Sequence, residues 1–208
     1  KAKAKPKFRD ILSKSRAINI LSAARMFLFG ARDVWFVVAL PVYLSSVFGW
    51  DFWQVGGFLA AWVIGYGIVQ SLAPNITGKT RGHVPDGRAA FLWALALAGL
   101  PAAIALGLNT GLSPQAVLLG GLMIFGVLFA VNSSLHSYLI VSYAKEDGVS
   151  LDVGFYYMSN ALGRLIGTVL SGSVYQVSGL GACLWISSAF VLLAALISIA
   201  LPRHALSE

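Results

Sequence analysis

The stretch Ala23–Tyr43, AARMFLFGARDVWFVVALPVY, is apolar and long enough to cross a bilayer, and it decides the fold class. Three ionisable residues nevertheless lie inside it: Arg25, Arg32 and Asp33. A charged side chain near the bilayer centre costs roughly 2.5–3.5 kcal/mol on insertion scales, so such residues usually face a water-filled cavity, a partner or a substrate. At about 100° per residue, Arg25 and Arg32 lie on nearly one helix face, with Asp33 on its flank. The segment therefore predicts a membrane helix that turns a cationic stripe inward.

The composition extends this prediction to the whole chain. Of the 208 residues, 58% are hydrophobic and 11% are charged, whereas roughly a quarter are charged in soluble domains. Successive apolar runs of about twenty residues exclude a soluble core as the main interpretation. Cys183 is the only cysteine, which excludes a disulfide framework or a thiolate metal cluster within the chain. We expect a protein of the lipid bilayer with no metal and no cofactor.

Basic residues gather at the amino-terminal end. The net charge is +7, and seven of the fifteen Lys and Arg residues lie between Lys1 and Arg16. No nucleic-acid-binding motif accompanies them, so we expect a basic cytoplasmic linker over residues 1–16 and no nucleic-acid partner. The segment does not have the pattern of a signal peptide. Its polar start without an initiator Met indicates a fragment of a longer protein.

Six predicted spans make up a transmembrane domain over residues 17–201, followed by a cytoplasmic tail over residues 202–208. Helix-start signals support the boundaries, because Asp51 and Gln54 form a capping-box pattern and Ser113 precedes Pro114. Four residues are expected at or beyond helix ends: Pro74, Gly111, Gly148 and Pro202. The predicted spans are Ala17–Val47, Phe52–Ala73, Arg88–Leu108, Pro114–Tyr143, Leu151–Val177 and Gly181–Leu201.

Loop charges predict the orientation. Besides the linker and the tail, Lys and Arg occur in two alternate loops, at Lys79, Arg81 and Lys145. The turns between these loops, near Gly49, Thr110 and Ser178, contain no Lys or Arg. The positive-inside rule therefore places both termini in the cytoplasm. We expect a multi-pass protein of the inner (cell) membrane.

Polarity also varies between the spans in a repeating order. After Arg88 at its start, the third span holds no ionisable residue, and the sixth holds none apart from the thiol of Cys183, whereas the first, fourth and fifth are polar. A three-plus-three arrangement explains this order, with the first two helices of each triplet near a cavity, as in the inverted repeats of transporters. Small residues at four-residue intervals predict close helix packing. They are Gly57, Ala61 and Gly65, then Ser159, Gly163, Gly167 and Ser171.

Five polar residues inside the spans are predicted to bind a substrate: Arg25, Arg32, Asn132, His136 and Arg164. At about 1.5 Å per residue, Arg32, Asn132 and Arg164 fall near the bilayer centre, and the other two fall nearer the cytoplasmic mouth. Arginine keeps its proton, and its planar fork pairs with phosphate or carboxylate oxygens. We therefore expect a small anion rich in oxygen acceptors. Asp33 and His136 are candidates for proton coupling.

Structural interpretations stay open for each arginine. Arg25 can extend to the cytoplasmic interface instead of binding a ligand. Arg32 can be neutralised by Asp33. Arg164 follows Asn160 by four residues and can bond to it.

Other residues carry weaker signals. His136 has three interpretations, which are proton relay, substrate donor and packing histidine. Pro41 predicts a kink in the outer half of the first span. We expect no catalytic residue: the segment closest to an intramembrane serine-protease motif is Val169–Gly172, which lacks the first Gly, and the only later His is His204.

The same residues resemble a known family. The string SRAINILSAARMFLFGARDVWFVVALPVYLSSVFGW is similar to the seventh-helix region of ArsJ organoarsenical efflux permeases, members of the major facilitator superfamily. The strings FWQVGGFLAAWVIGYGIVQ, NSSLHSYLI and VGFYYMSNALGRLIGT resemble later helices of that family. The resemblance covers essentially the whole chain to Leu201. It implies an all-α major-facilitator half with a 3+3 inverted repeat, corresponding to the C-terminal six helices.

What this resemblance implies is export of 1-arseno-3-phosphoglycerate and hence arsenate resistance. That ester forms when glyceraldehyde-3-phosphate dehydrogenase uses arsenate in place of phosphate, which makes the dehydrogenase a functional partner. The resemblance also implies a missing N-terminal six-helix half, because the site of a facilitator lies between two halves. Two alternatives stay open. One is a facilitator that exchanges another organophosphate or organic anion, and the other is a non-transporting membrane scaffold whose arginines pair with a partner.

Overall fold

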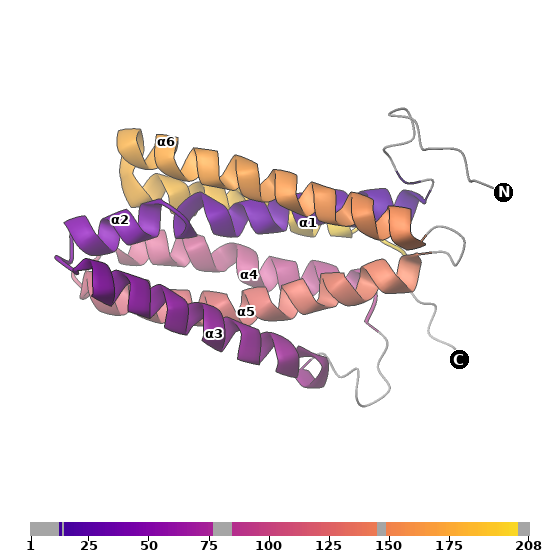
Figure 1. The fold of residues 1–208 in the computed structure, drawn as a ribbon, viewed down its shortest axis with the longest axis horizontal. Helices are drawn as coiled ribbons and strands as arrows, with labels where there is room; N and C mark the ends of the chain where they lie inside the picture. The colour runs from indigo at the N-terminus through magenta and orange to yellow at the C-terminus, as the bar shows by residue number, and fades with distance from the viewer. Residues whose placement is uncertain (1–12, 14, 77–84, 145–148, 204–208) are drawn as a thin grey trace.

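The computed structural model describes residue 13 and residues 15–76, 85–144 and 149–203 (Figure 1). Every regular element in these ranges is an α-helix, so the predicted all-α class is confirmed. The helices are α1 (Arg16–Phe36), α2 (Ala39–Ser46), α3 (Phe52–Ile76), α4 (Gly87–Gly107), α5 (Pro114–Tyr143) and α6 (Val149–Ser198).

Five helical segments of the described chain are long and apolar enough to cross a membrane: α1 with α2, then α3, α4, α5 and α6. The mean hydropathy of their most apolar windows lies between 1.5 and 2.3. Lengths of 21 residues or more match the roughly 20 residues that a bilayer core requires. These helices are compatible with a membrane protein.

The longest helix, α6, changes direction at Gly179. The backbone there has φ 73° and ψ −175°, which a residue without a Cβ adopts without strain. In Figure 1 the orange first half and the yellow second half run back alongside each other. The thiol of Cys183 lies 4.0 Å from the carbonyl oxygen of Ser171, across the bend. The predicted turn near Ser178 therefore falls at this kink.

The first predicted span is also interrupted, between α1 and α2. Pro41 has no N–H, and its ring disfavours a continuous helix through the preceding turn. The backbone N–H groups of Val38 and Ala39 donate to the Oγ of Ser171, at 3.3 and 3.0 Å. A buried hydroxyl from α6 thus takes the place of helical carbonyl acceptors, and the predicted kink is confirmed.

Most predicted helix boundaries agree with the structure. Asp51 and Gln54 form the predicted reciprocal cap, at 2.8 and 2.9 Å, and the Oγ of Ser113 accepts from the N–H of Ala116 at 3.4 Å. One boundary was wrong: α3 continues through Pro74 to Ile76. A proline in the last turn removes one backbone donor without ending the helix. Gly111 and Pro202 lie outside helices as expected, and Gly148 lies outside the described residues.

The helices form one bundle in which α1 packs mainly against α6, α6 against α4, α4 against α5, and α5 against α3. Alternate helix ends meet at one end of the bundle, on the right in Figure 1. There the Oγ of Ser13 donates to Asp152 at 2.6 Å, and the carbonyl of Pro202 accepts from Gly87 N and Tyr143 Oη, both at 3.1 Å. The chain therefore crosses the bundle back and forth. Lys79, Arg81 and Lys145, which fixed the predicted orientation, lie outside the described residues.

The helix α3 is the least buried element of the bundle, with only Trp62 and Ala73 buried. The indole N–H of Trp62 donates to the carbonyl of Leu122 on α5 at 3.1 Å. A Cβ added at Gly57 or Gly65 would meet nothing within 4 Å. The close packing predicted for this Gly57–Gly65 face is therefore not formed within the described chain.

Candidate anion-binding site

A single buried carboxylate joins α1 to the first half of α6. The Oδ1 of Asp33 accepts from the Nε of Arg32 at 2.6 Å, and its Oδ2 accepts from the Nε of Arg164 at 3.0 Å. The Asp33 side chain is 1% exposed, whereas that of Arg32 is 15% and that of Arg164 is 54% exposed. Arg32 is therefore paired with Asp33, which is one of the two interpretations that the sequence left open. Arg164 also bonds to Asp33, not to Asn160.

Glycines bring the two helices close enough for this bridge. A Cβ added at Gly163 would overlap the backbone carbonyl of Met26, and one added at Gly167 would lie 2.6 Å from the carbonyl oxygen of Gly30. The same Cβ would lie 3.0 Å from the Cβ of Asp33. The close packing predicted for Gly163 and Gly167 is confirmed. It allows a short aspartate on α1 to reach an arginine on α6.

Arg25 occupies a second layer, about two helical turns from Asp33 along α1. It is 5% exposed. Its Nη1 donates to the carbonyl and Oγ of Ser133 on α5, at 3.1 and 3.3 Å, and its Nε donates to the Oδ1 of Asn160 at 3.2 Å. The interpretation in which Arg25 extends to the interface is therefore wrong. The guanidinium is held between α1, α5 and α6.

The aromatic rings of Phe29 and Phe129 lie against the guanidinium groups of the α1 arginines. The Cζ of Arg25 lies 3.8 Å from the centroid of Phe29, and the Cζ of Arg32 lies 5.1 Å from the same centroid. Phe129 of α5 lies 5.4 Å from Arg32 and meets Phe29 edge to face at 5.1 Å. Tyr156 also lies 5.1 Å from Arg25. Guanidinium groups are attracted to the faces of such rings.

Asn132 and His136 are fully buried on α5. The amide nitrogen of Asn132 donates to the carbonyls of Trp93 on α4 and Leu128, both at 2.9 Å. In the described part of the chain, the Oδ1 of Asn132 and both ring nitrogens of His136 have no hydrogen-bond partner. Since buried polar groups are nearly always paired, these three atoms mark a place for water or another polar group. Of the five predicted site residues, Arg32 and Arg164 therefore meet at Asp33, whereas Arg25, Asn132 and His136 are buried and make no hydrogen bond to that carboxylate in the described chain.

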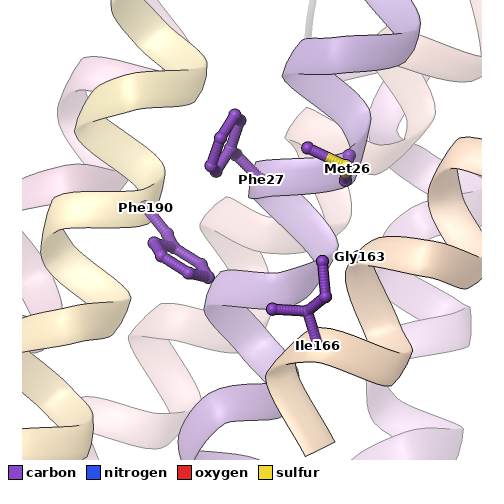
Figure 2. Close-up of a pocket in the computed structure, with 5 residues that line it drawn as sticks. All are labelled: Met26, Phe27, Gly163, Ile166 and Phe190. Atoms are coloured by element: carbon purple, nitrogen blue, oxygen red, sulfur yellow. The ribbon is translucent and has the colours of Figure 1, made fainter. Parts of the chain in front are cut away.

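A small hollow lies on the outside of the α1–α6 crossing, lined by Met26, Phe27, Gly163, Ile166 and Phe190 (Figure 2). Its volume is about 20 Å³ and its lining is almost entirely apolar. Ligand pockets for organic molecules measure about 300–1,000 Å³, so this hollow does not hold the predicted anion. An exposed cationic side chain of the candidate site lies elsewhere, at Arg164, which is more than half exposed.

The charges around Asp33 suit an anion with oxygen acceptors. Arg25, Arg32 and Arg164 contribute three positive charges and Asp33 one negative charge, which leaves two positive charges. Asp33 accepts hydrogen bonds from the Nε atoms of Arg32 and Arg164. Within the described residues, the Nη groups of these two arginines donate to no protein atom. Guanidinium Nη groups without a protein acceptor can donate to a phosphate or carboxylate. In the same residues, no group of three or more His, Cys, Asp and Glu side chains could hold a metal ion.

Several residues of this arrangement were not singled out from the sequence as site residues. Ser133 and Phe29 could have been found from spacing, because Ser133 adjoins Asn132 and Phe29 stands four residues after Arg25 and three before Arg32. Ser171 belonged to a predicted packing stripe, yet its hydroxyl accepts from the α1–α2 break. Pairings between helices depend on how the helices rotate against each other, which spacing in one helix does not give.

The sequence matches no model of a known protein family and no curated protein.

Proposed function

We propose that this chain is the C-terminal six-helix half of an efflux permease that exports an oxygen-rich organic anion by alternating access. The observation that carries the proposal is the sharing of Asp33 between Arg32 and Arg164. Two arginines in an apolar helical bundle offer terminal donors to a ligand while a single carboxylate holds them in place. Charged residues at such positions most often mark a substrate pathway.

The six-span topology belongs to the same proposal. Counting the two halves of α6 as separate spans gives six, and the Gly179 kink supports that count. An even number of spans puts both ends of the chain on one side of the membrane, and the loop charges favour the cytoplasmic side. The exposed side chain of Arg164 and the little-buried α3 are compatible with a second six-helix half completing the cavity.

We propose 1-arseno-3-phosphoglycerate as the cargo, on the strength of the family resemblance. The ester carries a phosphate and an arsenate group, both of which present oxygens to guanidinium donors. Arg32 and Arg164 are the primary contacts. Arg25, Asn132 and His136 are buried, and Arg25 reaches a ligand only by releasing Ser133 or Asn160. The cellular supply of this cargo depends on glyceraldehyde-3-phosphate dehydrogenase.

The sign of any proton coupling follows from charge. Protonating Asp33 removes the counter-charge of Arg32 and Arg164, and protonating His136 adds a positive charge. Either event makes the site more positive and strengthens anion binding, because opposite charges attract more strongly in a poorly solvated site. A proton bound at either residue would therefore travel with the anion. Export driven by the concentration gradient of the cargo itself needs no such proton.

Everted membrane vesicles from cells that express the full-length protein test the proposal. Arsenic uptake is measured with arsenate alone, then with arsenate plus the dehydrogenase, its cofactor and glyceraldehyde 3-phosphate. We expect uptake only in the complete mixture, and we expect Arg32→Gln to abolish it at unchanged protein abundance. Uptake equal to that of vesicles without the protein would refute the cargo.

Two other functions are separable by the same assay. A facilitator that exchanges another organophosphate would show uptake of labelled phosphate esters without arsenate, since guanidinium donors accept either oxyanion. A non-transporting scaffold is favoured by one observation, the internal pairing of both arginines with Asp33. In that case Arg32→Gln would lower the amount of folded protein, and vesicles holding the unaltered protein would transport none of these anions.

A further inference from the structure

The ring of Phe29 lies against both arginines of α1. The Cζ atoms of Arg25 and Arg32 lie 3.8 and 5.1 Å from the centroid of this ring. The spacing along the helix produces this geometry, because residues three and four apart occupy the same helix face. Phe29 is 7% exposed, and Phe129 meets it edge to face at 5.1 Å. The ring is thus held in place from α5.

A guanidinium stacked on an aromatic face is restricted in orientation. The attraction between the cation and the ring is stronger where water is excluded, as it is around Arg25. The N–H bonds of a guanidinium lie in its plane, so a ring that covers one face leaves the donors directed sideways. Phe29 therefore restricts two guanidiniums. That of Arg25 donates to Asn160 and Ser133. That of Arg32 donates to Asp33 through its Nε, and its Nη groups stay available to a ligand.

We propose that Phe29 is a positioning residue for the anion site, an inference that rests on the proposed function. Phe29 acts through Arg25 and Arg32 and does not itself bond to the ligand. Stacking on the ring reduces the conformational freedom that the guanidiniums lose when an oxyanion binds, which raises the affinity. The ligand class that gains most is a tetrahedral oxyanion such as a phosphate monoester, because it needs several donors at fixed angles.

The test compares Phe29→Leu, Phe29→Tyr and Phe27→Leu in the full-length protein, reconstituted in lipid nanodiscs. Isothermal titration calorimetry with 3-phosphoglycerate as the probe gives the dissociation constant. We expect Phe29→Leu to weaken binding about tenfold, because it removes two cation–π contacts and keeps an apolar side chain. Phe29→Tyr keeps the ring face and should bind within about twofold of the unaltered chain.

Phe27→Leu is the matched control. Phe27 lies on the same helix and meets Phe190 edge to face at 5.5 Å, away from any guanidinium that the structure pairs with a ring. Its replacement should therefore leave the affinity unchanged even if it lowers stability. Equal affinities for Phe29→Leu and the unaltered chain would overturn the inference, and so would an equal loss in Phe27→Leu.

A second measurement does not depend on ligand binding. In the unliganded chain, the Nε–H proton resonances of Arg25 and Arg32 should be displaced upfield by the ring, and Phe29→Leu should remove the displacement. The resonance of Arg164, which has no ring contact in the described chain, serves as the internal reference. Unmoved arginine resonances would refute the stacking. If the unaltered chain binds no phosphate ester, the proposed function fails and so does the role in anion binding, while these resonances still report whether the ring orders the arginines.

Discussion

The Nε of Arg164 lies 3.0 Å from the Oδ2 of Asp33, although 131 positions separate the two residues in the chain. The contact ties the first half of α6 to α1 at the point where Gly163 and Gly167 allow the two backbones to approach. Asp33 is buried and also accepts from Arg32. One carboxylate therefore bridges the two helices at their crossing and orients two arginines.

Replacing Asp33 with Asn should destabilise the protein strongly. The change leaves Arg32 and Arg164 without their counter-charge, and breaking a buried ion pair by removing one partner costs about 3–5 kcal/mol. Thermal unfolding in detergent measures the loss. The double variant Asp33→Asn with Arg32→Gln should recover part of the stability, because it removes one of the two uncompensated charges. An unchanged midpoint for Asp33→Asn would contradict the buried bridge.

Arg164→Gln should weaken the anion site with little effect on folding. The side chain is more than half exposed, and exposed ion pairs contribute about 0–1 kcal/mol to stability. Charge-assisted hydrogen bonds contribute about 1.5–3 kcal/mol each, so the KM for transport should rise roughly tenfold to a hundredfold. Vesicle uptake measures it. Arg88→Gln, an exposed arginine at the start of α4, is the control and should leave the KM unchanged.

Gly163→Ala should lower the free energy of unfolding by about 1–3 kcal/mol, because the new methyl group overlaps the Met26 carbonyl and the helices must separate. Gly154 lies on the same helix, and a Cβ there would meet nothing within 4 Å. Gly154→Ala should therefore be neutral or should stabilise by up to about 1 kcal/mol. Thermal unfolding of the two variants side by side checks the pair, and equal midpoints would argue against the crossing.

Ser171→Ala should loosen the break between α1 and α2. The N–H groups of Val38 and Ala39 lose their shared acceptor, and an unsatisfied buried donor costs about 1–3 kcal/mol. Hydrogen exchange at these two amides should accelerate. Ser173→Ala is the control, since the Oγ of Ser173 donates only to carbonyls of its own helix. Unchanged exchange at Val38 and Ala39 in Ser171→Ala would show that the hydroxyl does not hold the break.

Much of the fold could be predicted from the sequence because its signals are local. Apolar length identified the helices, Asp51 and Ser113 identified two starts, and Pro41 identified the kink. The packing of α3 could not be predicted in this way. Its residues Gly57, Ala61 and Gly65 recur every four positions, as Gly163 and Gly167 do, but a Cβ would meet another helix in the described chain at Gly163 and Gly167 and not at Gly57 or Gly65. The spacing of small residues shows which helix faces can pack closely, and the positions of the neighbouring helices determine which of these faces do so.

The sequence indicated which residues belong to the candidate site, but not which of them bond to each other. Arginine in an apolar helix costs enough to indicate Arg25, Arg32 and Arg164 as special residues. Which acceptor each one meets depends on the rotation and depth of separate helices. The sequence left open a bond between Arg164 and Asn160 on the same helix, whereas in the structure Asn160 accepts from Arg25 and Asp33 accepts from Arg164.

The shared Asp33 carboxylate also determines how the proposed transporter responds to membrane voltage. With the three arginines, it leaves the empty site with two positive charges. The proposed cargo carries a phosphate and an arsenate group, each with up to two negative charges, so the loaded site is neutral or negative and a field that is negative inside does not oppose its turning outward. The empty site experiences about 2.3 kcal/mol per elementary charge for each 100 mV that it crosses. In a cell that is negative inside, the field pulls this empty site back toward the cytoplasm, so voltage would speed the return of the unloaded carrier, and it would also favour the outward step of a cargo with more than two negative charges.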